Sequence, residues 1–199
     1  MKTMLMVTSQ AFSLHNFRGA LIKELVKQGW KVICAAPDMD GSIENKLERI
    51  GAEVRFISGN RAKISVMADI AFMHDIYKLV KVSKPDAILL YFIKPVLYGA
   101  LVSGYLSVKR RILLIEGMGY VFTENAFRVK YILRPLIKFL FTCAISCATK
   151  VIVLNEDDKK LISRMAFNKN KISKIQGIGV DLDLFRVKED ASPVSKTYD

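Results

Sequence analysis

Two aspartates separated by one residue, Asp38 and Asp40, form the pair in the sequence that most resembles a metal site. Two carboxylates on one loop could bind Mg²⁺, which prefers oxygen ligands. The same pair is typical of a solvent-exposed turn with a cap for the next helix, and acidic pairs of this spacing are common by chance. We therefore predict that the chain holds no metal.

Several polar residues follow segments that are typical of buried strands. His15 lies in a polar stretch after the first such segment, Lys94 follows the fourth and Glu116 follows the fifth. Ligands of parallel α/β sheets bind beyond the carboxyl ends of the strands, so these side chains are expected near a ligand. Gly117 and Gly119 would give the loop after Glu116 backbone freedom and let a ligand approach closely.

The glycine patterns that bind nucleotide phosphates are missing from the sequence. A dinucleotide-binding fold carries Gly-x-Gly-x-x-Gly directly after its first strand, whereas this region has Gly19 alone. The sequence also contains no Walker A pattern. Ordinary NAD binding is therefore disfavoured.

A basic stripe is formed by Lys130, Arg134 and Lys138, which are four residues apart on a helix expected over residues 127–148. Between residues 126 and 150 the chain has five basic residues and no acidic one. One interpretation is a surface that faces anionic phospholipid or a lipid pyrophosphate. The alternative is an ordinary solvated helix face. The aromatic residues nearby do not follow an RNA-binding pattern, so we expect no nucleic-acid partner.

The composition favours a folded protein that works near a polyanion. The 199 residues are 51% hydrophobic and 25% charged, which excludes a disordered or low-complexity class. The net charge is +12 and the mean hydropathy is +0.23, a combination that indicates a membrane surface. Three cysteines without paired spacing predict neither disulfides nor zinc, and a reducing cytoplasm is the expected location.

Strand and helix patterns alternate along the whole chain. Strands are expected over residues 4–9, 31–35, 53–57, 87–93, 111–115, 151–154 and 171–175, and helices over 16–28, 43–50, 65–82, 96–106, 127–148 and 156–165. This alternation predicts an α/β fold with a doubly wound, mostly parallel sheet of about seven strands and helices on both faces. Residues 1–186 would form the domain, and residues 187–199, which lose their apolar content, would form a linker.

One apolar stretch, residues 87–108, is long enough to cross a bilayer as a single helix. It contains one charge, Lys94, which is followed by Pro95. The residues before this pair are typical of a buried strand, and those after it have the small-residue spacing of a packed helix. We therefore expect a strand, a turn and a helix here, with a transmembrane helix as the alternative.

Four segments of the sequence resemble the N-terminal half of bacterial family-4 glycosyltransferases, which have the two-domain GT-B architecture. The segments are SLHNFRGALI at 13–22, IKPVLYGA at 93–100, EGMGYVFT at 116–123, and VIVLNEDD at 151–158 together with GIGVDLDLF at 177–185. Their order and spacing agree over nearly the whole chain.

The resemblance implies a Rossmann-like acceptor-binding domain of an enzyme that transfers a sugar with retention and without a metal or other cofactor. The donor would be a nucleotide-sugar, expected to be UDP-linked, and the acceptor a lipid-linked saccharide of surface polysaccharide or glycan synthesis. The catalytic residues stay unknown. The residues assigned to substrate binding are Ser13, His15, Asn16, Arg18, Gly19, Lys94, Glu116, Gly117, Gly119 and Tyr120. Glu116 would accept hydrogen bonds from sugar hydroxyls, and Tyr120 would pack on a sugar ring, rather than support the fold.

The resemblance also implies that a C-terminal donor-binding domain is missing, because residues 177–185 normally lead into it. The chain would then be inactive alone and need a donor domain or a separate donor-binding subunit. The expected location is the cytoplasm, peripheral at the inner face of the plasma membrane. Two alternatives stay open: a non-catalytic membrane subunit that recruits a separate catalytic half, and a sugar-nucleotide epimerase, which would use His15 and Glu116.

Overall fold

Short aliphatic runs form the strands of one parallel sheet. The computed structural model of the chain describes residues 1–59, 65–117 and 133–179, and in these residues seven strands pair in the order β3-β2-β1-β4-β5-β6-β7. The strands are β1 (Thr3–Val7), β2 (Lys31–Ala36), β3 (Ala52–Phe56), β4 (Ala87–Tyr91), β5 (Arg110–Ile115), β6 (Lys150–Val153) and β7 (Ile172–Lys174). All six pairings are parallel. The predicted fold class is confirmed.

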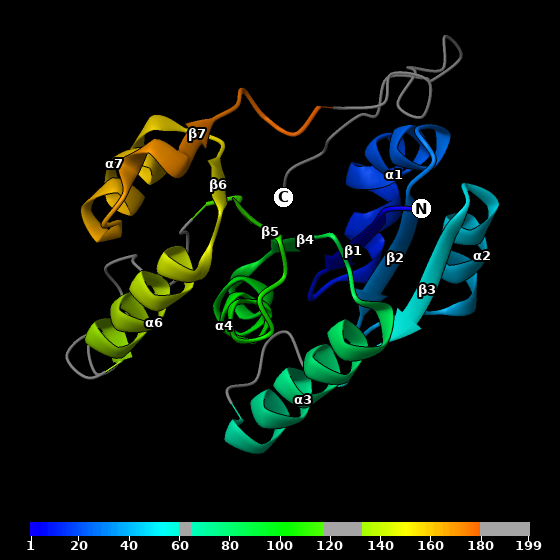
Figure 1. Cartoon of the computed structure of the whole chain (residues 1–199), viewed down its shortest axis with the longest axis horizontal. Coiled ribbons are helices and arrows are strands. Elements are labelled where there is room, and N and C mark those ends of the chain that lie inside the picture. The colour runs from blue at the N-terminus through cyan, green and yellow to red at the C-terminus, as the bar shows by residue number, and fades with distance from the viewer. Residues whose placement is uncertain (60–64, 118–132, 180–199) are drawn as a thin grey trace, which may run out of the picture.

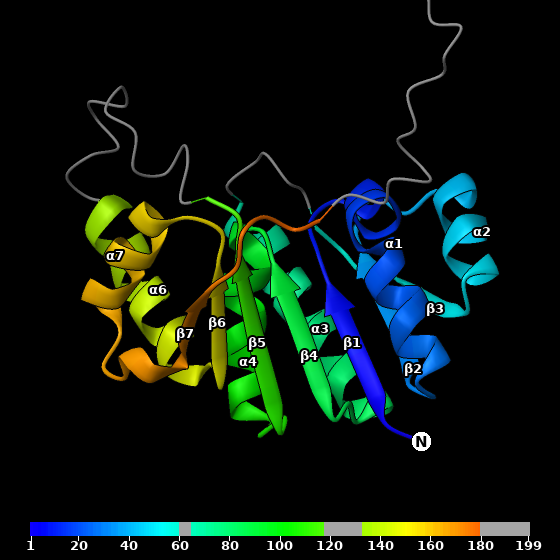
Figure 2. The ribbon, with the colours of Figure 1, turned by 90° about the horizontal axis from the view of Figure 1, so that it is seen from above.

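The strand order reverses between β1 and β4, which lie side by side in the middle of the sheet (Figure 2). From β1 the chain builds outward through β2 and β3, and from β4 it builds outward in the other direction through β5, β6 and β7. In open α/β sheets, ligands bind at such a reversal, beyond the carboxyl ends of the strands. The region above β1, β4 and β5 is therefore the place to look for a site.

Helices cover both faces of the sheet (Figure 1). The helices α1 (Ala11–Lys27) and α2 (Gly41–Arg49) cover one face, and the other face carries α3 (Val66–Ser83), the π-helical turn η1 (Pro95–Gly99), α4 (Ala100–Tyr105), α6 (Leu133–Cys147) and α7 (Glu156–Met165). A short turn η2 (Lys169–Lys171) precedes β7.

The side chains of each strand alternate between two apolar cores. In β1, Leu5 and Val7 pack in the core beneath α3 and α6, while Met4 and Met6 pack in the core beneath α1. All four have exposed fractions of 8% or less. Because both faces are buried, the strand is a continuous apolar run without polar alternation, as parallel sheets require.

The helix α1 begins at Ala11, five residues before the predicted start at Asn16. The N-cap residue Gln10 makes no capping hydrogen bond with its side chain. Instead, the Ala11 N–H donates to Asp38 Oδ1 at 2.6 Å, so the cap comes from a residue 27 positions away. A local sequence pattern could not reveal this cap. As a result, Ser13 and His15 lie in the helix and not in a loop, and Asn16 lies within the helix and not at its start.

Residues 87–108 fold as the predicted strand, turn and helix: β4, then η1, then α4. A Cβ at Gly99 would lie 2.7 Å from Leu90 Cδ2, so a larger residue here would force the buried Leu90 side chain to move. In the part of the chain that the structure describes, no helix is long and apolar enough to cross a membrane.

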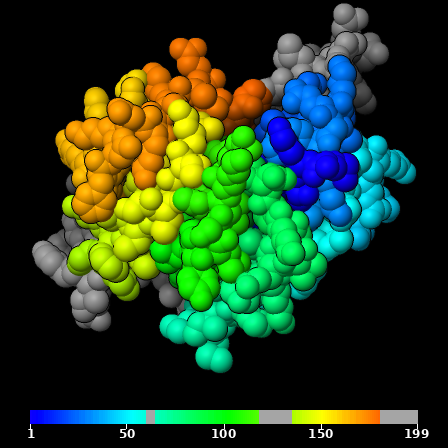
Figure 3. All heavy atoms as spheres, in the orientation of Figure 1, coloured from blue at the N-terminus to red at the C-terminus, as the bar shows by residue number. Residues whose placement is uncertain are grey.

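The segment after β7, residues 175–179, crosses toward the N-terminal region, where the orange atoms reach the blue ones (Figure 3). Its Ile175, Ile178 and Gly179 border the same hollow as α1. The predictions for Gly119, Tyr120, Lys130 and the linker at 187–199 lie outside the described residues, as does the first part of the helix expected over 127–148.

Candidate functional site

The carboxyl edge at the strand reversal carries a buried ion pair between Arg18 and Glu116. Arg18 comes from α1 and Glu116 directly follows β5, and Arg18 Nη2 donates to Glu116 Oε1. Only 4% of the Arg18 side chain and 17% of the Glu116 side chain are exposed. The guanidinium carbon lies 4.8 Å from the centre of the Tyr91 ring at the end of β4, a cation–π contact. Residues from α1, β4 and the turn after β5 thus meet at one point.

A chain of hydroxyl groups continues from Tyr91 into the start of α1. The hydroxyls of Tyr91 and Ser13 lie 3.1 Å apart, and Ser13 Oγ lies 3.3 Å from Thr8 Oγ1. Ser13 Oγ also donates to the Gln10 carbonyl at 2.6 Å. Burial raises the pKa of Tyr91 above its ordinary value, against the opposing effect of its hydrogen bonds, so the phenol stays neutral.

One nitrogen of the buried guanidinium has no hydrogen-bond partner in the described residues. Arg18 Nη1 donates to the Phe17 carbonyl at 3.1 Å and Nη2 donates to Glu116, but no acceptor in the described residues reaches Nε. A buried donor without a partner costs roughly 1–3 kcal/mol, so natural folds keep few of them. Arg18 Nε is therefore a buried donor that the described residues leave unpaired, in a side chain that is only 4% exposed.

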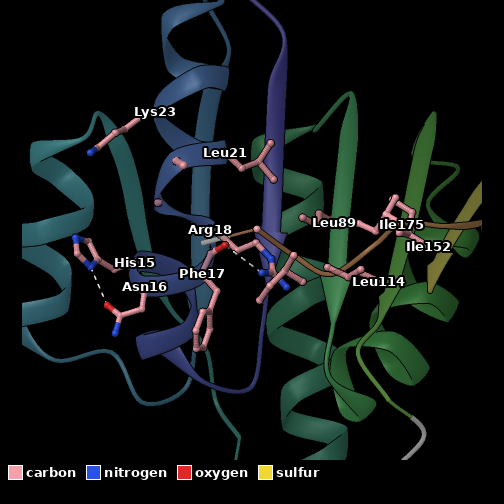
Figure 4. A pocket seen from close by; sticks show the side chains of 14 residues that line it. His15, Asn16, Phe17, Arg18, Leu21, Lys23, Leu89, Leu114, Ile152 and Ile175 are labelled. Carbon is pink, nitrogen blue, oxygen red and sulfur yellow. Dashed lines mark hydrogen bonds between the residues drawn. The ribbon is translucent and has the colours of Figure 1, made fainter. Parts of the chain in front are cut away.

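Arg18 borders a hollow of about 280 Å³ between α1, the sheet and the segment after β7 (Figure 4). Its remaining wall is mostly aliphatic and comes from Leu21 of α1, Leu89 of β4, Leu114 of β5, Ile152 of β6, and Ile175 and Ile178. Figure 4 shows Arg18 pointing from α1 toward the strands, with Leu89 and Leu114 opposite. The volume is slightly below the usual range of ligand pockets, which is about 300–1,000 Å³.

A second polar cluster lies on the other face, where α3 meets η1. Lys94 Nζ lies 2.7 Å from Asp69 Oδ1, and the Tyr98 hydroxyl donates to Asp69 Oδ2 at 3.0 Å. Burial and the Asp69 carboxylate together raise the pKa of Tyr98 to about 12. Asp69 and Tyr98 were missed as site residues. Tyr98 stands four positions after Lys94 within the recognised 93–100 segment, but nothing in the sequence pattern marks Asp69.

The structure brings together only part of the predicted substrate set. Ser13, Arg18, Gly19 and Glu116 gather at the carboxyl edge by the hollow, and Lys94 stands in the cluster with Asp69.

The side chains of His15 and Asn16 bond to each other, with 3.0 Å from Nδ1 to Oδ1, and point away from the strands (Figure 4). Gly117 is exposed with φ = 106°, a conformation that favours glycine, and it borders a smaller hollow of about 110 Å³ beside Glu116.

The two aspartates with metal-like spacing act as helix caps. Asp38 accepts from the Ala11 N–H at 2.6 Å, and Asp40 accepts from the Ile43 N–H at 2.8 Å. The prediction that this pair caps the next helix is confirmed for Asp40. Over residues 1–59, 65–117 and 133–179, no group of three or more His, Cys, Asp or Glu side chains could hold a metal ion.

The described part of the basic stripe is mixed with exposed apolar side chains. Lys138 is exposed on α6, and its neighbours Leu136 and Phe139 are 53% and 62% exposed. Lys130 and the side chain of Arg134 lie outside the described part of the chain.

Comparison with known proteins gives one matching family and several relatives. The profile of the family described as "Glycosyl transferase 4-like" matches residues 5–155. The N,N'-diacetylbacillosaminyl-diphospho-undecaprenol alpha-1,3-N-acetylgalactosaminyltransferase of Campylobacter jejuni is 24% identical over 173 residues, which are 87% of this chain and 45% of that protein.

Several solved structures share the fold at low sequence identity. MurG of Acinetobacter baumannii has a TM-score of 0.58 at 14% identity, covering 89% of this chain and 45% of its own. A glycosyltransferase of Rickettsia africae has a TM-score of 0.57 at 17% identity, covering 92% of this chain and 44% of its own. The UDP-GlcNAc 2-epimerase of Methanocaldococcus jannaschii has a TM-score of 0.56 at 16% identity, covering 88% of this chain and 45% of its own. The chain therefore spans about half the length of the proteins that it resembles.

Proposed function

Because the chain belongs to the glycosyl transferase 4-like family, we propose that it forms the acceptor-binding half of a retaining glycosyltransferase. The enzyme would move a sugar from a nucleotide-sugar to a lipid-linked saccharide at a membrane surface. The C. jejuni relative supports the acceptor class, since its name specifies a sugar linked to diphospho-undecaprenol. The proposed location is the cytoplasmic face of the membrane.

The observation that carries the proposal is the Arg18–Glu116 pair at the strand reversal. This is where the fold places ligands, and the pair is buried next to two hollows. Carboxylate oxygens accept hydrogen bonds from sugar hydroxyls, and 17% of the Glu116 side chain is open to a ligand. We assign Glu116 to the acceptor sugar and Arg18 to holding Glu116 in place.

This arrangement supplies one wall of a reaction site. Transfer requires the donor and the acceptor to be held together in a reactive geometry, which lowers the barrier by an amount of up to about 7–11 kcal/mol. The described residues offer polar contacts for a sugar but no metal cluster and no glycine-rich phosphate loop. The relatives are about twice as long as this chain. We therefore assign the nucleotide-sugar to a second half that corresponds to the additional length of the relatives.

The exposed surface of α6 supports a membrane contact. Leu136 and Phe139 could enter the apolar edge of a lipid layer, while Lys138 would face the anionic headgroups. A lipid-linked acceptor would then reach the carboxyl edge without leaving its membrane.

The test compares the chain alone with the same chain fused to the donor half of a related glycosyltransferase. Both proteins are incubated with UDP-sugars and an undecaprenyl-diphosphate-linked saccharide, and released UDP and lengthened lipid product are measured. We expect multiple turnovers from the fusion and none from the chain alone. Multiple turnovers by the purified chain alone would contradict the half-enzyme assignment.

The same preparation separates the alternatives. Conversion of UDP-GlcNAc to its 2-epimer by the fusion, without lipid product, would favour an epimerase. Two results together would favour a recruiting subunit. The chain would bind a separate catalytic subunit, and its Glu116→Gln variant would leave sugar transfer unchanged.

A further inference from the structure

The strand β4 is followed by a residue with a strained backbone, Phe92. Its φ is 67°, in the left-handed region that bulky side chains rarely adopt. The Phe92 carbonyl accepts the Val96 N–H at 3.0 Å, and the π-helical turn η1 follows. Backbone strain and π-helical turns are both rare, and both are concentrated at functional sites. The two features occur together here, where the strand order of the sheet reverses.

The strained φ decides on which face of the sheet the Phe92 side chain lies. Successive residues of a strand point to opposite faces, and in β4 Leu90 packs beneath α3 and α6, whereas Tyr91 packs beneath α1. A regular strand would therefore place Phe92 on the same face as Leu90. Instead, Phe92 packs against the core beneath α1, and the centres of the Phe92 and Tyr91 rings are 5.3 Å apart.

The turn at the end of β4 does not by itself require a phenylalanine. Glycine adopts a positive φ without a steric cost, and asparagine is enriched in this conformation. A phenylalanine here strains the backbone and places an aromatic ring beside Tyr91. We infer that the position of this ring is useful to the protein.

The Phe92 ring lies close to the Arg18–Glu116 ion pair. The Tyr91 ring is 4.8 Å from the guanidinium carbon of Arg18, and Arg18 donates to Glu116. Phe92 and Glu116 also border the same hollow of about 110 Å³. Of the described residues that line this hollow, Glu116 alone is charged, and the others have no polar side chain. The hollow thus combines an aromatic residue with a carboxylate.

Resting on the proposed function, we propose that Phe92 is a substrate-binding residue whose ring packs on the C–H face of the acceptor sugar. The C–H groups of one face of a pyranose are slightly positive, and the face of an aromatic ring is negative, so the two attract each other. Glu116 would accept hydrogen bonds from the hydroxyls of the same sugar. A cavity of about 150 Å³ holds a six-membered ring, so this hollow would take up one side of the sugar.

Other classes of ligand fit the hollow less well. An anion would meet the Glu116 carboxylate without a cation in the described lining, and an amine would find Glu116 already paired with Arg18. A hydrocarbon chain would remove water from the carboxylate without replacing its hydrogen bonds, which is costly. A sugar offers hydroxyls to the carboxylate and C–H groups to the ring.

The first measurement tests the strain. At an ordinary φ, a glycine variant is less stable than an alanine variant, because glycine loses more conformational freedom on folding. At a positive φ this order should reverse, so we expect Phe92→Gly to have a higher thermal midpoint than Phe92→Ala. The same two changes at Phe56, in the regular strand β3, should give the ordinary order. A more stable alanine variant at residue 92 would overturn the proposal, because the ring would then not be held beside Tyr91.

The binding experiment uses the chain of 199 residues and free sugars as probes. Saturation-transfer NMR is recorded with glucose, galactose, mannose, N-acetylglucosamine and N-acetylgalactosamine. We expect at least one of them to bind, with stronger saturation of the C–H protons on one face of its ring than on the other. Binding of none of these sugars would overturn the proposal.

Variants then assign the binding to Phe92. Phe92→Leu removes the ring but keeps an apolar side chain, and it should weaken binding of the same sugar about tenfold, or about 1.4 kcal/mol. Phe92→Tyr keeps the ring and should keep the binding. The matched control is Phe56→Leu, because Phe56 also ends a strand but is 70% exposed. Unchanged binding by a folded Phe92→Leu variant would overturn the assignment.

A measurement on the wild-type chain covers the case in which Phe92→Leu does not fold. The ring signals of Phe92 are identified by comparison with the Phe92→Tyr variant. We expect nuclear Overhauser effects between these ring protons and the C–H protons of the bound sugar. Their absence would overturn the proposal.

Two further probes test the role of the sugar hydroxyls. Cyclohexylmethanol provides a six-membered ring without them, and farnesol represents the prenyl chain of a lipid-linked acceptor. We expect neither probe to displace the sugar at equal concentration. Displacement by either one would assign the hollow to an apolar ligand and overturn the proposal.

The outcome is separable from that of the proposed function. In the fusion with a donor half, Phe92→Leu should raise the KM for the lipid-linked acceptor about tenfold and leave the KM for the UDP-sugar unchanged. An active fusion whose acceptor KM does not change would overturn only the role of Phe92. Sugar binding that depends on Phe92, together with an inactive fusion, would overturn only the transferase proposal.

Discussion

Among single residues, Glu116 has two roles. It pairs with a buried cation of the fold, and it lies where a substrate is expected to bind. From the sequence, Glu116 was expected to contact a sugar without holding the structure. In the structure it is paired with Arg18, and the guanidinium of Arg18 is almost entirely buried against Tyr91. A buried cation depends on its partner, because removal of one member leaves an uncompensated charge.

We predict that Glu116→Gln lowers the free energy of unfolding by roughly 1.5–3 kcal/mol, the range for hydrogen bonds to charged groups. Surface substitutions usually stay within about 0.5 kcal/mol, so the two cases are distinguishable by urea denaturation. The matched control is Glu48→Gln, an exposed glutamate on α2. A double-mutant cycle with Arg18→Met should show coupling between the two sites. Additive effects would mean that the ion pair contributes nothing to stability.

At the scale of elements, distant side chains set where the helices begin and how they are held. Asp38, in the loop after β2, caps α1, and Asp40 caps α2 two residues later. The start of α1 in turn places Ser13 against Tyr91 and Arg18 against Glu116. One loop therefore positions the helix that carries much of the candidate site.

Loss of the cap should be measurable. We predict that Asp38→Ala costs about 1 kcal/mol of unfolding free energy, as helix caps usually do. Asp38→Asn should cost less, because its amide oxygen can still accept from the Ala11 N–H. Asp40→Ala, which removes the cap of α2 instead, is the matched comparison. Equal stability of the Ala and Asn variants would show that the cap is not important.

Asp75 gives α3 a pH-dependent link to the loop after β3. The Ser58 N–H donates to Asp75 Oδ2 at 2.7 Å. Burial raises the pKa of Asp75, but the hydrogen bonds from Ser58 and the positive charges of Lys78 and His74 lower it more, so the folded pKa lies below 3.8. The stabilisation is therefore present above the unfolded pKa of about 3.9 and is lost as the pH falls through the folded value.

We predict that Asp75→Asn is less stable than the wild type at pH 7 and that this difference shrinks below about pH 4. Thermal midpoints measured between pH 7 and pH 2.5 provide the check, with Asp157→Asn, an exposed acid on α7, as the control. A difference that stays constant with pH would contradict a contribution from the ionised carboxylate.

For the whole molecule, the proposed membrane contact rests on the excess of positive charge and on the exposed apolar residues of α6. The chain has 31 basic and 19 acidic residues. Each Lys or Arg near an anionic membrane contributes on the order of 1 kcal/mol, within a screening length of about 8 Å at physiological salt.

We predict that the chain binds vesicles containing phosphatidylserine and that binding weakens as salt increases. Changing Lys130, Arg134 and Lys138 to Gln should reduce sedimentation with these vesicles strongly without unfolding the domain. The control is a triple change of Lys159, Lys160 and Arg164 to Gln on α7, which removes the same charge elsewhere. Equal losses in both variants would indicate an effect of net charge, and equal binding by all three proteins would make the stripe a solvated face.

The fold class follows from the amino-acid sequence alone. Apolar runs of strand length that alternate with amphipathic segments can bury their surfaces in few ways, and the doubly wound parallel sheet satisfies all of them at once. The same reasoning assigned residues 87–108 to β4, η1 and α4, because Lys94 and Pro95 interrupt the apolar run. The resemblance to family-4 glycosyltransferases, based on four spaced segments, agrees with the family match.

Which of the predicted site residues meet depends on long-range contacts that appear only in the folded chain. Arg18 and Glu116 are 98 positions apart, and Ser13 and Tyr91 are 78 apart. The hydrogen bond from the Ala11 N–H to Asp38 caps α1 at a position that no nearby residue indicates. The helix therefore includes residues that were expected in a loop. Periodicity and capping rules describe interactions within a few residues, whereas these contacts depend on the order β1-β4-β5 in the sheet. The elements were therefore readable from the sequence, but the buried pair and the hollow beside it were not.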